Sequence, residues 1–257
     1  MSTKTLKKLS RSVTKRIDYI SRKFEKPQLK ADGLIIERSR NLDFLDEHAF
    51  SSAWEAVSSF NDKFWGGKTP DVRWRVHFCL WAARHGLTLE GDFVECGVNT
   101  GLFSSMIYKV LHFGETNKQF WLFDTYEGIP LDGASDEEKA MAISMNKCLY
   151  NFDALKVAKE VFGCYPNARL VKGRLPQSLE QSKIDKIAYL SIDMNVASAE
   201  IETIEHLWDK IVPSAMIVLD DFGWSGHREQ YDAWTKFAAE KGSSILHSPT
   251  GQGVIIK

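Results

Sequence analysis

The chain of 257 residues is 44% hydrophobic and has a formal net charge of −1, which suits one well-buried domain with appendages. The near-neutral charge argues against a nucleic-acid-binding protein that depends on a general basic field. Its four cysteines are scattered without metal-ligand spacing, and no apolar run reaches the ~20 residues that cross a bilayer, so we expect a cytoplasmic protein without a disulfide framework or a zinc site.

Residues 1–30 are rich in lysine and arginine and poor in acids. Apolar residues recur every three or four positions from Leu6 to Phe24, which predicts a basic amphipathic helix that ends near Pro27. We expect its apolar stripe to pack on the body of the protein or on a second subunit in a homo-oligomer. The alternatives are peripheral contact with an anionic membrane surface and a segment without fixed structure.

Residues 31–90 are expected to form a helical cap or lid. Helical spacing runs from Glu47 to Leu87 and is interrupted at "WGGKTPD", where glycines and a proline break the helix and leave a mobile connector. From Gly91 onward, helical stretches alternate with β-rich runs, namely DFVECG, QFWLFD, ARLVKG, IAYLSID, AMIVLDD, SSILHS and GVIIK. This alternation predicts an α/β domain over residues 91–257, with a mostly parallel sheet covered by helices on both faces.

The ends of the expected strands are candidate site positions, because ligands of open α/β sheets collect beyond the carboxyl ends of the strands. The first strand ends in "VECGVNTG", where glycines allow close backbone approach and the following helix N-terminus favours negative charge. Asp124 ends the second strand, where an acidic side chain can accept hydrogen bonds from a ribose diol. The later strand ends supply Gly173, then Asp193 and Asn195, then Asp220 and Asp221.

The adjacent carboxylates Asp220 and Asp221 follow an apolar run typical of a buried strand. Successive side chains of a strand point to opposite faces, so both cannot be ordinary surface residues of one regular strand. A buried lone carboxylate is costly unless it is paired, hydrogen-bonded or bound to a metal. The pair therefore indicates a ligand.

The segments "FVECGVNTGLFSSMI", "FWLFDTYEGIP", "LVKGRLPQSL", "LSIDMN" and "IVLDDFGWSG" resemble, in order and spacing, the macrocin O-methyltransferase family, whose members methylate sugar hydroxyls of macrolides, aminocoumarins and other glycosides. The resemblance covers Gly91 to Lys257. It implies a class I S-adenosylmethionine-dependent methyltransferase with a Rossmann-like seven-stranded sheet, a divalent metal, and a small-molecule or glycan acceptor.

The resemblance also implies roles for residues at the strand ends. Glu95 and Gly97 would line the methionine part of S-adenosylmethionine, Asp124 would bind its ribose, and Gly173 would adjoin its adenine. The cofactor-binding set it implies is Glu95, Gly97, Asn99, Gly101, Asp124, Thr125, Gly173 and Arg174. The metal ligands it implies are Asp193, Asp220 and Asp221.

Three carboxylates without a histidine or thiolate suit Mg²⁺. Such an ion would orient two neighbouring hydroxyls of the acceptor and lower the pKa of one of them. Family members commonly carry a second aspartate two residues after the first ligand, as a candidate general base. This chain has Asn195 there, and an amide cannot accept a proton at neutral pH. His227 and Asp193 are the other candidate catalytic groups, although His227 also fits a surface position at a helix start.

Three other functions stay open. A catechol-like phenol is an alternative acceptor, because its paired oxygens would chelate Mg²⁺ equally well. A dehydrogenase would also use Asp124 for a ribose, but the turn "CGVNTG" lacks the G-x-G-x-x-G pattern. A non-catalytic S-adenosylmethionine-binding protein would tolerate Asn195.

Overall fold

The computed structural model describes residues 28–31, 34–36 and 41–257. The basic helix predicted from Leu6 to Phe24 lies outside these residues, so its contacts with a second subunit or a membrane stay predictions. Gln28–Ala31 forms strand β1, which pairs antiparallel with β2 (Leu34–Ile36), so the end of the expected helical segment 1–30 is extended. Within the described part of the chain, no helix is long and apolar enough to span a membrane.

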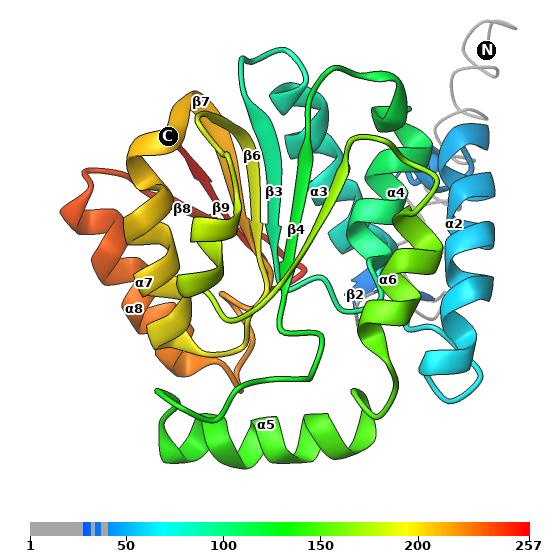
Figure 1. Ribbon diagram of the computed structural model, residues 1–257. Coiled ribbons are helices and arrows are strands. Elements are labelled where there is room, and N and C mark those ends of the chain that lie inside the picture. Colours follow the sequence, from blue (N-terminus) through cyan, green and yellow to red (C-terminus); the bar gives the residue numbers. More distant parts are fainter. Residues whose placement is uncertain (1–27, 32–33, 37–40) are drawn as a thin grey trace, which may run out of the picture.

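Two helices precede the main sheet, as the helical spacing predicted. They are α2 (His48–Asn61) and α3 (Arg73–Gly86), with the short 3₁₀ helices η1 (Asp43–Leu45) and η2 (Asp62–Phe64) beside α2. The connector between α2 and α3 is held by hydrogen bonds, because Thr69 donates its backbone N–H and its hydroxyl to Asp62 at 2.7 and 2.9 Å. Helix α3 packs directly on the sheet, whereas α2 packs farther out, on α4 (Leu102–Val110) (Figure 1).

The main sheet has seven strands in the order β5-β4-β3-β6-β7-β9-β8. Their bounds are β3 (Asp92–Cys96), β4 (Phe120–Asp124), β5 (Ala168–Lys172), β6 (Ile187–Ile192), β7 (Ile211–Leu219), β8 (Ile245–His247) and β9 (Gly253–Ile256). Strands β3 to β7 pair in parallel, and β9 runs antiparallel to both β7 and β8. The chain leaves β3 toward one edge and returns to β6 on its other side, which creates a switch point where such sheets bind ligands.

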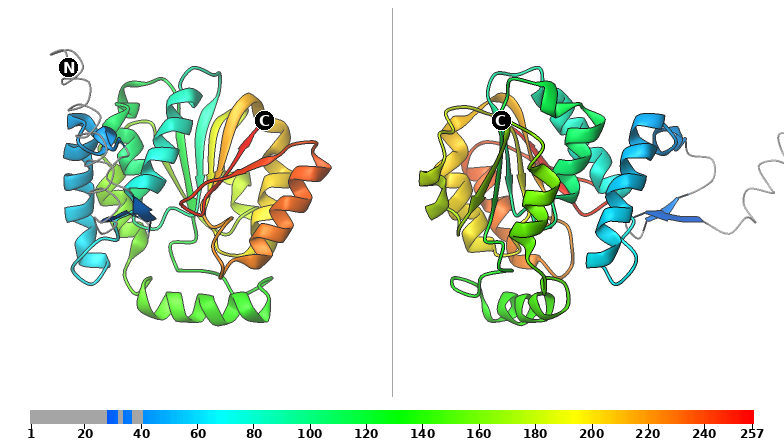
Figure 2. Two further views of the ribbon diagram at one scale, coloured as in Figure 1. Left: turned by 180° about the vertical axis from the view of Figure 1, so that it is seen from behind. Right: turned by 45° about the vertical axis from the view of Figure 1, so that its right-hand side comes forward.

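Helices cover both faces of the sheet, which confirms the predicted α/β architecture (Figures 1 and 2). Along β4, Phe120 and Leu122 pack on the α3 and α4 side, whereas Trp121 and Phe123 pack on the opposite side. This period of two follows from the pleat, and burial on both faces explains the near-continuous apolar sequences of the strands. The remaining helices are α6 (Ala154–Phe162), α7 (Ala197–Leu207), α8 (Arg228–Glu240), and the 3₁₀ helices η3 (Phe113–Glu115), η4 (Gln177–Gln181) and η5 (Trp208–Lys210).

Helix α5 (Asp136–Cys148) lies apart from both layers, across the carboxyl edge of the parallel strands (Figure 1). Its N-terminus carries a capping box in which Ser135 and Glu138 each accept a hydrogen bond from the other's backbone N–H. The position of α5 encloses the space beyond the strand ends.

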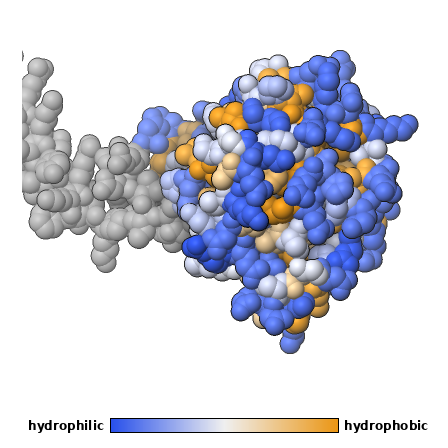
Figure 3. All heavy atoms as spheres, turned by 90° about the vertical axis from the view of Figure 1, so that its left-hand side faces the viewer, coloured by the Kyte–Doolittle hydropathy of each residue, from blue (hydrophilic) through white to orange (hydrophobic). Residues whose placement is uncertain are grey.

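The side of the molecule seen in Figure 3 is mainly hydrophilic, with apolar atoms in separate patches.

Candidate active site

A cavity of about 330 Å³ lies at the carboxyl edge of the parallel strands, between the strand ends and α5. It is the space in which the predicted site residues meet. Those that line it are Glu95, Gly97, Asn99, Asp124, Thr125, Gly173, Arg174, Asp193, Asn195, Asp220 and Asp221. Gly101 and His227 do not line it: Gly101 is the N-cap residue before α4, in the left-handed region at φ 76°, and His227 precedes α8.

The glycine turn after β3 is joined to its neighbours by backbone hydrogen bonds beyond the regular ladder. Gly97 donates to the carbonyl oxygen of Phe123 at 2.8 Å, and Asp193 donates to that of Cys96 at 2.8 Å. Asp220 in turn donates its backbone N–H to the carbonyl oxygen of Ile192 at 3.0 Å. The ends of β3, β4, β6 and β7 are therefore fixed relative to one another, which brings the expected cofactor turn and the acidic residues together.

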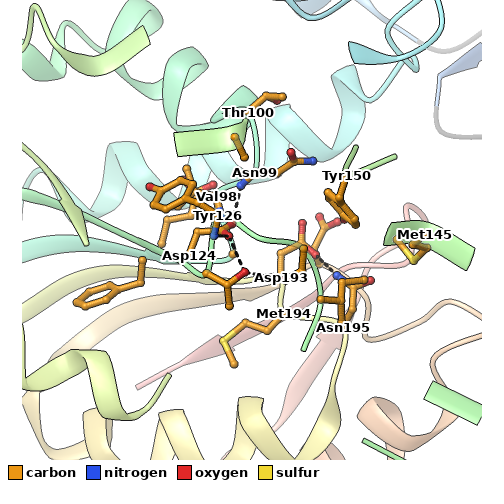
Figure 4. A pocket seen from close by; sticks show the side chains of 18 of the residues that line it. Val98, Asn99, Thr100, Asp124, Tyr126, Met145, Tyr150, Asp193, Met194 and Asn195 are labelled. Atoms are coloured by element: carbon orange, nitrogen blue, oxygen red, sulfur yellow. Dashed lines mark hydrogen bonds between the residues drawn. The ribbon is translucent and has the colours of Figure 1, made fainter. Parts of the chain in front are cut away.

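Asp124 is held by this turn (Figure 4). Its Oδ2 accepts hydrogen bonds from the backbone N–H groups of Val98 and Asn99, both at 2.7 Å, and its Oδ1 accepts one from Tyr126 at 2.6 Å. A carboxylate has about four acceptor positions, so the chain itself uses most of them. Asp124 therefore fixes the backbone around the cavity, and a ribose hydroxyl would have to share an oxygen with these N–H groups.

Glu95 lies at the base of the cavity and is only 2% exposed. Its Oε2 has no hydrogen-bond partner within the described part of the chain. Burial raises the pKa of this carboxyl well above its usual value, and the nearby Asp193 raises it further. A buried carboxylate oxygen without a donor fits the cationic amino group of an amino acid, such as the methionine part of S-adenosylmethionine.

The acidic residues Asp193, Asp220 and Asp221 converge at the wall of the cavity. One carboxylate oxygen of each lies within 4.8 Å of one oxygen of the other two. Burial raises the pKa of Asp193 and of Asp221 well above the usual value, and the Asp220 charge raises both further. The Asp221 Oδ2 is buried and lacks a hydrogen-bond partner among the described residues. Three crowded oxygen donors, one of them unsatisfied, fit a divalent cation that prefers oxygen ligands.

Asp220 is fixed by two side chains from distant parts of the sequence. Arg75 on α3 donates from Nη1 to Asp220 Oδ2 at 2.7 Å, and Gln252, between β8 and β9, donates from Nε2 to Oδ1 at 2.9 Å. The guanidinium of Arg75 also lies 5.9 Å from the Phe103 ring and 5.6 Å from the Trp224 ring. One positive charge thus offsets part of the negative charge of the three carboxylates, and a dication would balance the remaining two.

Asn195 and His227 differ in their relation to the cavity. Asn195 takes a left-handed conformation at φ 61° and donates from Nδ2 to Asp193 Oδ1 at 3.2 Å, so it orients Asp193 (Figure 4). The His227 Nδ1 lies 3.7 Å from Asp221 Oδ2 and 3.0 Å from Gln230 Nε2. Burial lowers the pKa of His227, which favours its neutral form. His227 therefore lies next to Asp221 but does not line the cavity.

Arg75, Gln252 and Tyr150 were not predicted from the sequence. Tyr150 follows α5 and lines the cavity, where burial and then the negative charge of Asp193 raise the pKa of its hydroxyl, which stays a hydrogen-bond donor (Figure 4). None of the three belongs to a local motif. They meet the strand ends only through the tertiary fold.

The chain is similar in sequence to known O-methyltransferases. The family model described as macrocin-O-methyltransferase matches residues 82–247. Among curated relatives, an O-methyltransferase of Streptomyces olivaceus that acts on a rhamnosyl-tetracenomycin is 22% identical over 55% of this chain and 56% of its own. The mycinamicin III 3''-O-methyltransferase of Micromonospora griseorubida is 23% identical over 55% of this chain and 58% of its own. The chain thus spans little more than half the length of the curated relatives it matches.

Solved structures share the fold. The O-methyltransferase NovP is 17% identical and superposes with a TM-score of 0.65 over 83% of this chain and 98% of that one. An O-methyltransferase from Bacillus cereus, solved in complex with SAH, is 11% identical, with a TM-score of 0.56 over 84% of this chain and 96% of that one. These likenesses support the seven-stranded class I methyltransferase fold.

Proposed function

The chain belongs to the macrocin O-methyltransferase family, and we propose that it transfers a methyl group from S-adenosylmethionine to a hydroxyl of a sugar or glycosylated compound with the help of Mg²⁺. The observation that carries the proposal is the meeting of Asp193, Asp220 and Asp221 in the cavity that also contains the glycine turn. The curated relatives, which methylate glycosylated natural products by name, support the class of acceptor.

The residues of the glycine turn and Glu95 would hold the cofactor. Gly97 and Asn99 bring backbone close to the cavity, and the unpartnered Glu95 Oε2 is available to a cationic amino group. Gly173 and Arg174 line the side of the cavity next to β5, where an adenine would fit. When bound, S-adenosylmethionine supplies an electrophilic methyl group on a sulfonium.

Asp193, Asp220 and Asp221 would hold Mg²⁺, with Arg75 and Gln252 fixing the orientation of Asp220. When bound, the dication supplies charge that lowers the pKa of an acceptor hydroxyl and favours its reactive form. Asn195 orients Asp193 but cannot take the hydroxyl proton. We assign proton acceptance to Asp193, because His227 stands behind Asp221, outside the cavity wall.

The cavity walls would position the acceptor and exclude water. Met145 on α5 and Tyr150 just after it line the cavity (Figure 4), while Trp65 and Phe103 line it from other segments. Aromatic and thioether surfaces of this kind suit the apolar faces of a sugar ring, and the Tyr150 hydroxyl can donate to one of its oxygens.

A methyl-transfer screen tests the proposal. The protein is incubated with methyl-labelled S-adenosylmethionine and Mg²⁺ over a panel of glycosides, free sugars and catechols, and labelled product is measured. We expect transfer to at least one glycoside, and a loss of that transfer when chelator exceeds Mg²⁺. Transfer to catechols alone would assign the phenol as acceptor, and binding of S-adenosylmethionine without transfer to any class would indicate a non-catalytic protein.

A further inference from the structure

Helix α5 is attached to the protein by a small apolar cluster of its own. The buried members of this cluster are Ile129, Ala134, Ala142 and Val196. Val196 directly precedes α7 and follows the segment that carries Asp193 and Asn195, whereas Ala142 lies on α5. The cluster therefore joins α5 to the Asp193 segment, and it is separate from the two cores that cover the faces of the sheet.

Glu138 adds a buried charge to this junction. It is 5% exposed, its Oε2 accepts from the backbone N–H of Ser135 at 2.9 Å, and its Oε1 accepts from the backbone N–H of Ala197 at 2.7 Å. Within the described part of the chain it has no ion-pair partner, so these hydrogen bonds compensate its burial. Ser135 precedes α5 and Ala197 begins α7, so one carboxylate caps the positive ends of both helices.

The hydrogen bond from Ala197 to Glu138 lies close in the chain to Asp193, the candidate metal ligand. Only three residues separate Ala197 from Asp193, and Glu200 accepts a hydrogen bond from the backbone N–H of Met194 at 3.3 Å within this segment. Glu200 also accepts from Trp234 Nε1 at 2.7 Å, which anchors it to α8. The segment 193–197 is thus held by two buried carboxylates, Glu200 on α7 and Glu138 on α5.

We propose that Glu138 is a positioning residue that couples the docking of α5 to the placement of the Asp193 segment. The proposal rests on the proposed function only in treating Asp193 as a metal ligand. When α5 is docked, the Glu138 carboxylate fixes the backbone at Ala197, and the apolar cluster fixes Val196 beside it. When α5 moves away, both restraints on the far end of the segment are lost, and the direction of the Asp193 side chain is less defined.

Two variants remove the coupling hydrogen bond from opposite sides. Glu138→Leu removes both acceptor oxygens and keeps a side chain of similar size, so the Ala197 N–H loses its partner. Ala197→Pro removes the donor at the first position of α7, where proline is well tolerated. We expect each variant to speed backbone hydrogen exchange in residues 194–199 by about tenfold or more, and to weaken Mg²⁺ binding about tenfold, with S-adenosylhomocysteine affinity unchanged.

The controls leave this bond in place. Glu137→Gln changes the exposed neighbour of Glu138, and Ser135→Ala removes only the side-chain cap that accepts from the Glu138 backbone at 3.1 Å. Glu137→Gln should match the parent protein in hydrogen exchange and in Mg²⁺ affinity. Ser135→Ala should speed exchange in the first turn of α5 but not in residues 194–199.

Hydrogen exchange decides the coupling without reference to a metal. If Glu138→Leu and Ala197→Pro speed exchange in α5 alone, and residues 194–199 keep their protection, the coupling is overturned. Absence of Mg²⁺ binding to the parent protein would instead contradict the proposed function. Faster exchange in residues 194–199 would in that case still support the coupling.

Discussion

Asp193→Asn is expected to lower methyl transfer by about a thousandfold or more, which corresponds to roughly 4 kcal/mol of lost transition-state stabilisation. The substitution removes one charged oxygen ligand from the group of three carboxylates and keeps the oxygen to which Asn195 donates. Affinity for S-adenosylhomocysteine should change less than about threefold, because the metal serves the acceptor rather than the cofactor. Asp209→Asn, at an exposed aspartate outside the cavity, is the matched control.

The same variant should be at least as stable as the parent protein when Mg²⁺ is removed. The pKa of Asp193 is raised in the folded state, so the neutral form is the one the fold prefers. The associated stability is present below the unfolded-state pKa of about 3.9 and is lost as pH rises through the raised pKa. In thermal melts with chelator, Asp193→Asn should lose less stability with rising pH than the parent protein does. A variant that melts well below the parent protein at pH 8 without metal would indicate a structural aspartate.

Gly97→Ala is expected to disrupt the cofactor turn and the acidic segment at once. Gly97 has φ +91°, a conformation that other residues rarely adopt, and a Cβ there would lie 1.8 Å from the carbonyl oxygen of Asp193. That neighbour is backbone, so the clash separates the cofactor turn from the acidic segment. We expect the unfolding free energy to fall by roughly 4 kcal/mol or more, and affinity for S-adenosylhomocysteine to fall by about a hundredfold.

Gly226→Ala provides the comparison for this variant. Gly226 is exposed and has open space where a Cβ would be added, so its substitution should change stability by less than about 0.5 kcal/mol. Denaturant unfolding and calorimetry of the two variants measure the difference. Equal stability of Gly97→Ala and Gly226→Ala would contradict the close approach of the turn to Asp193.

The sequence predicted the seven strands of the main sheet and their carboxyl ends because local patterns determine both. β6 is buried on both faces and has a near-continuous apolar sequence, and the polar residues after each strand meet because parallel strands end at one edge. This geometry explains why Asp193, Asp220 and Asp221 meet, whereas their role as metal ligands was implied by the resemblance to the family.

Contacts between distant segments could not be predicted in this way. Arg75 is 145 positions from Asp220, and no local spacing links the two. Asp124 has the sequence context of a ribose-binding acid, yet only the folded turn shows backbone N–H groups at its oxygens. The spacing of Ser135 and Glu138 indicates a capping box, but it does not reveal the second bond to Ala197.

The central claim is that three carboxylates bind one divalent cation beside the cofactor. Calorimetric titration of the metal-free protein with Mg²⁺, in the presence of S-adenosylhomocysteine at pH 7.5, tests it most directly. We expect one ion bound per chain, with affinity that weakens as pH falls, because protons compete for carboxylates whose pKa values are raised. We also expect loss of this binding in Asp193→Asn and Asp221→Asn. Absence of a saturable Mg²⁺ site in the parent protein, or an equal site in both variants, would contradict the claim.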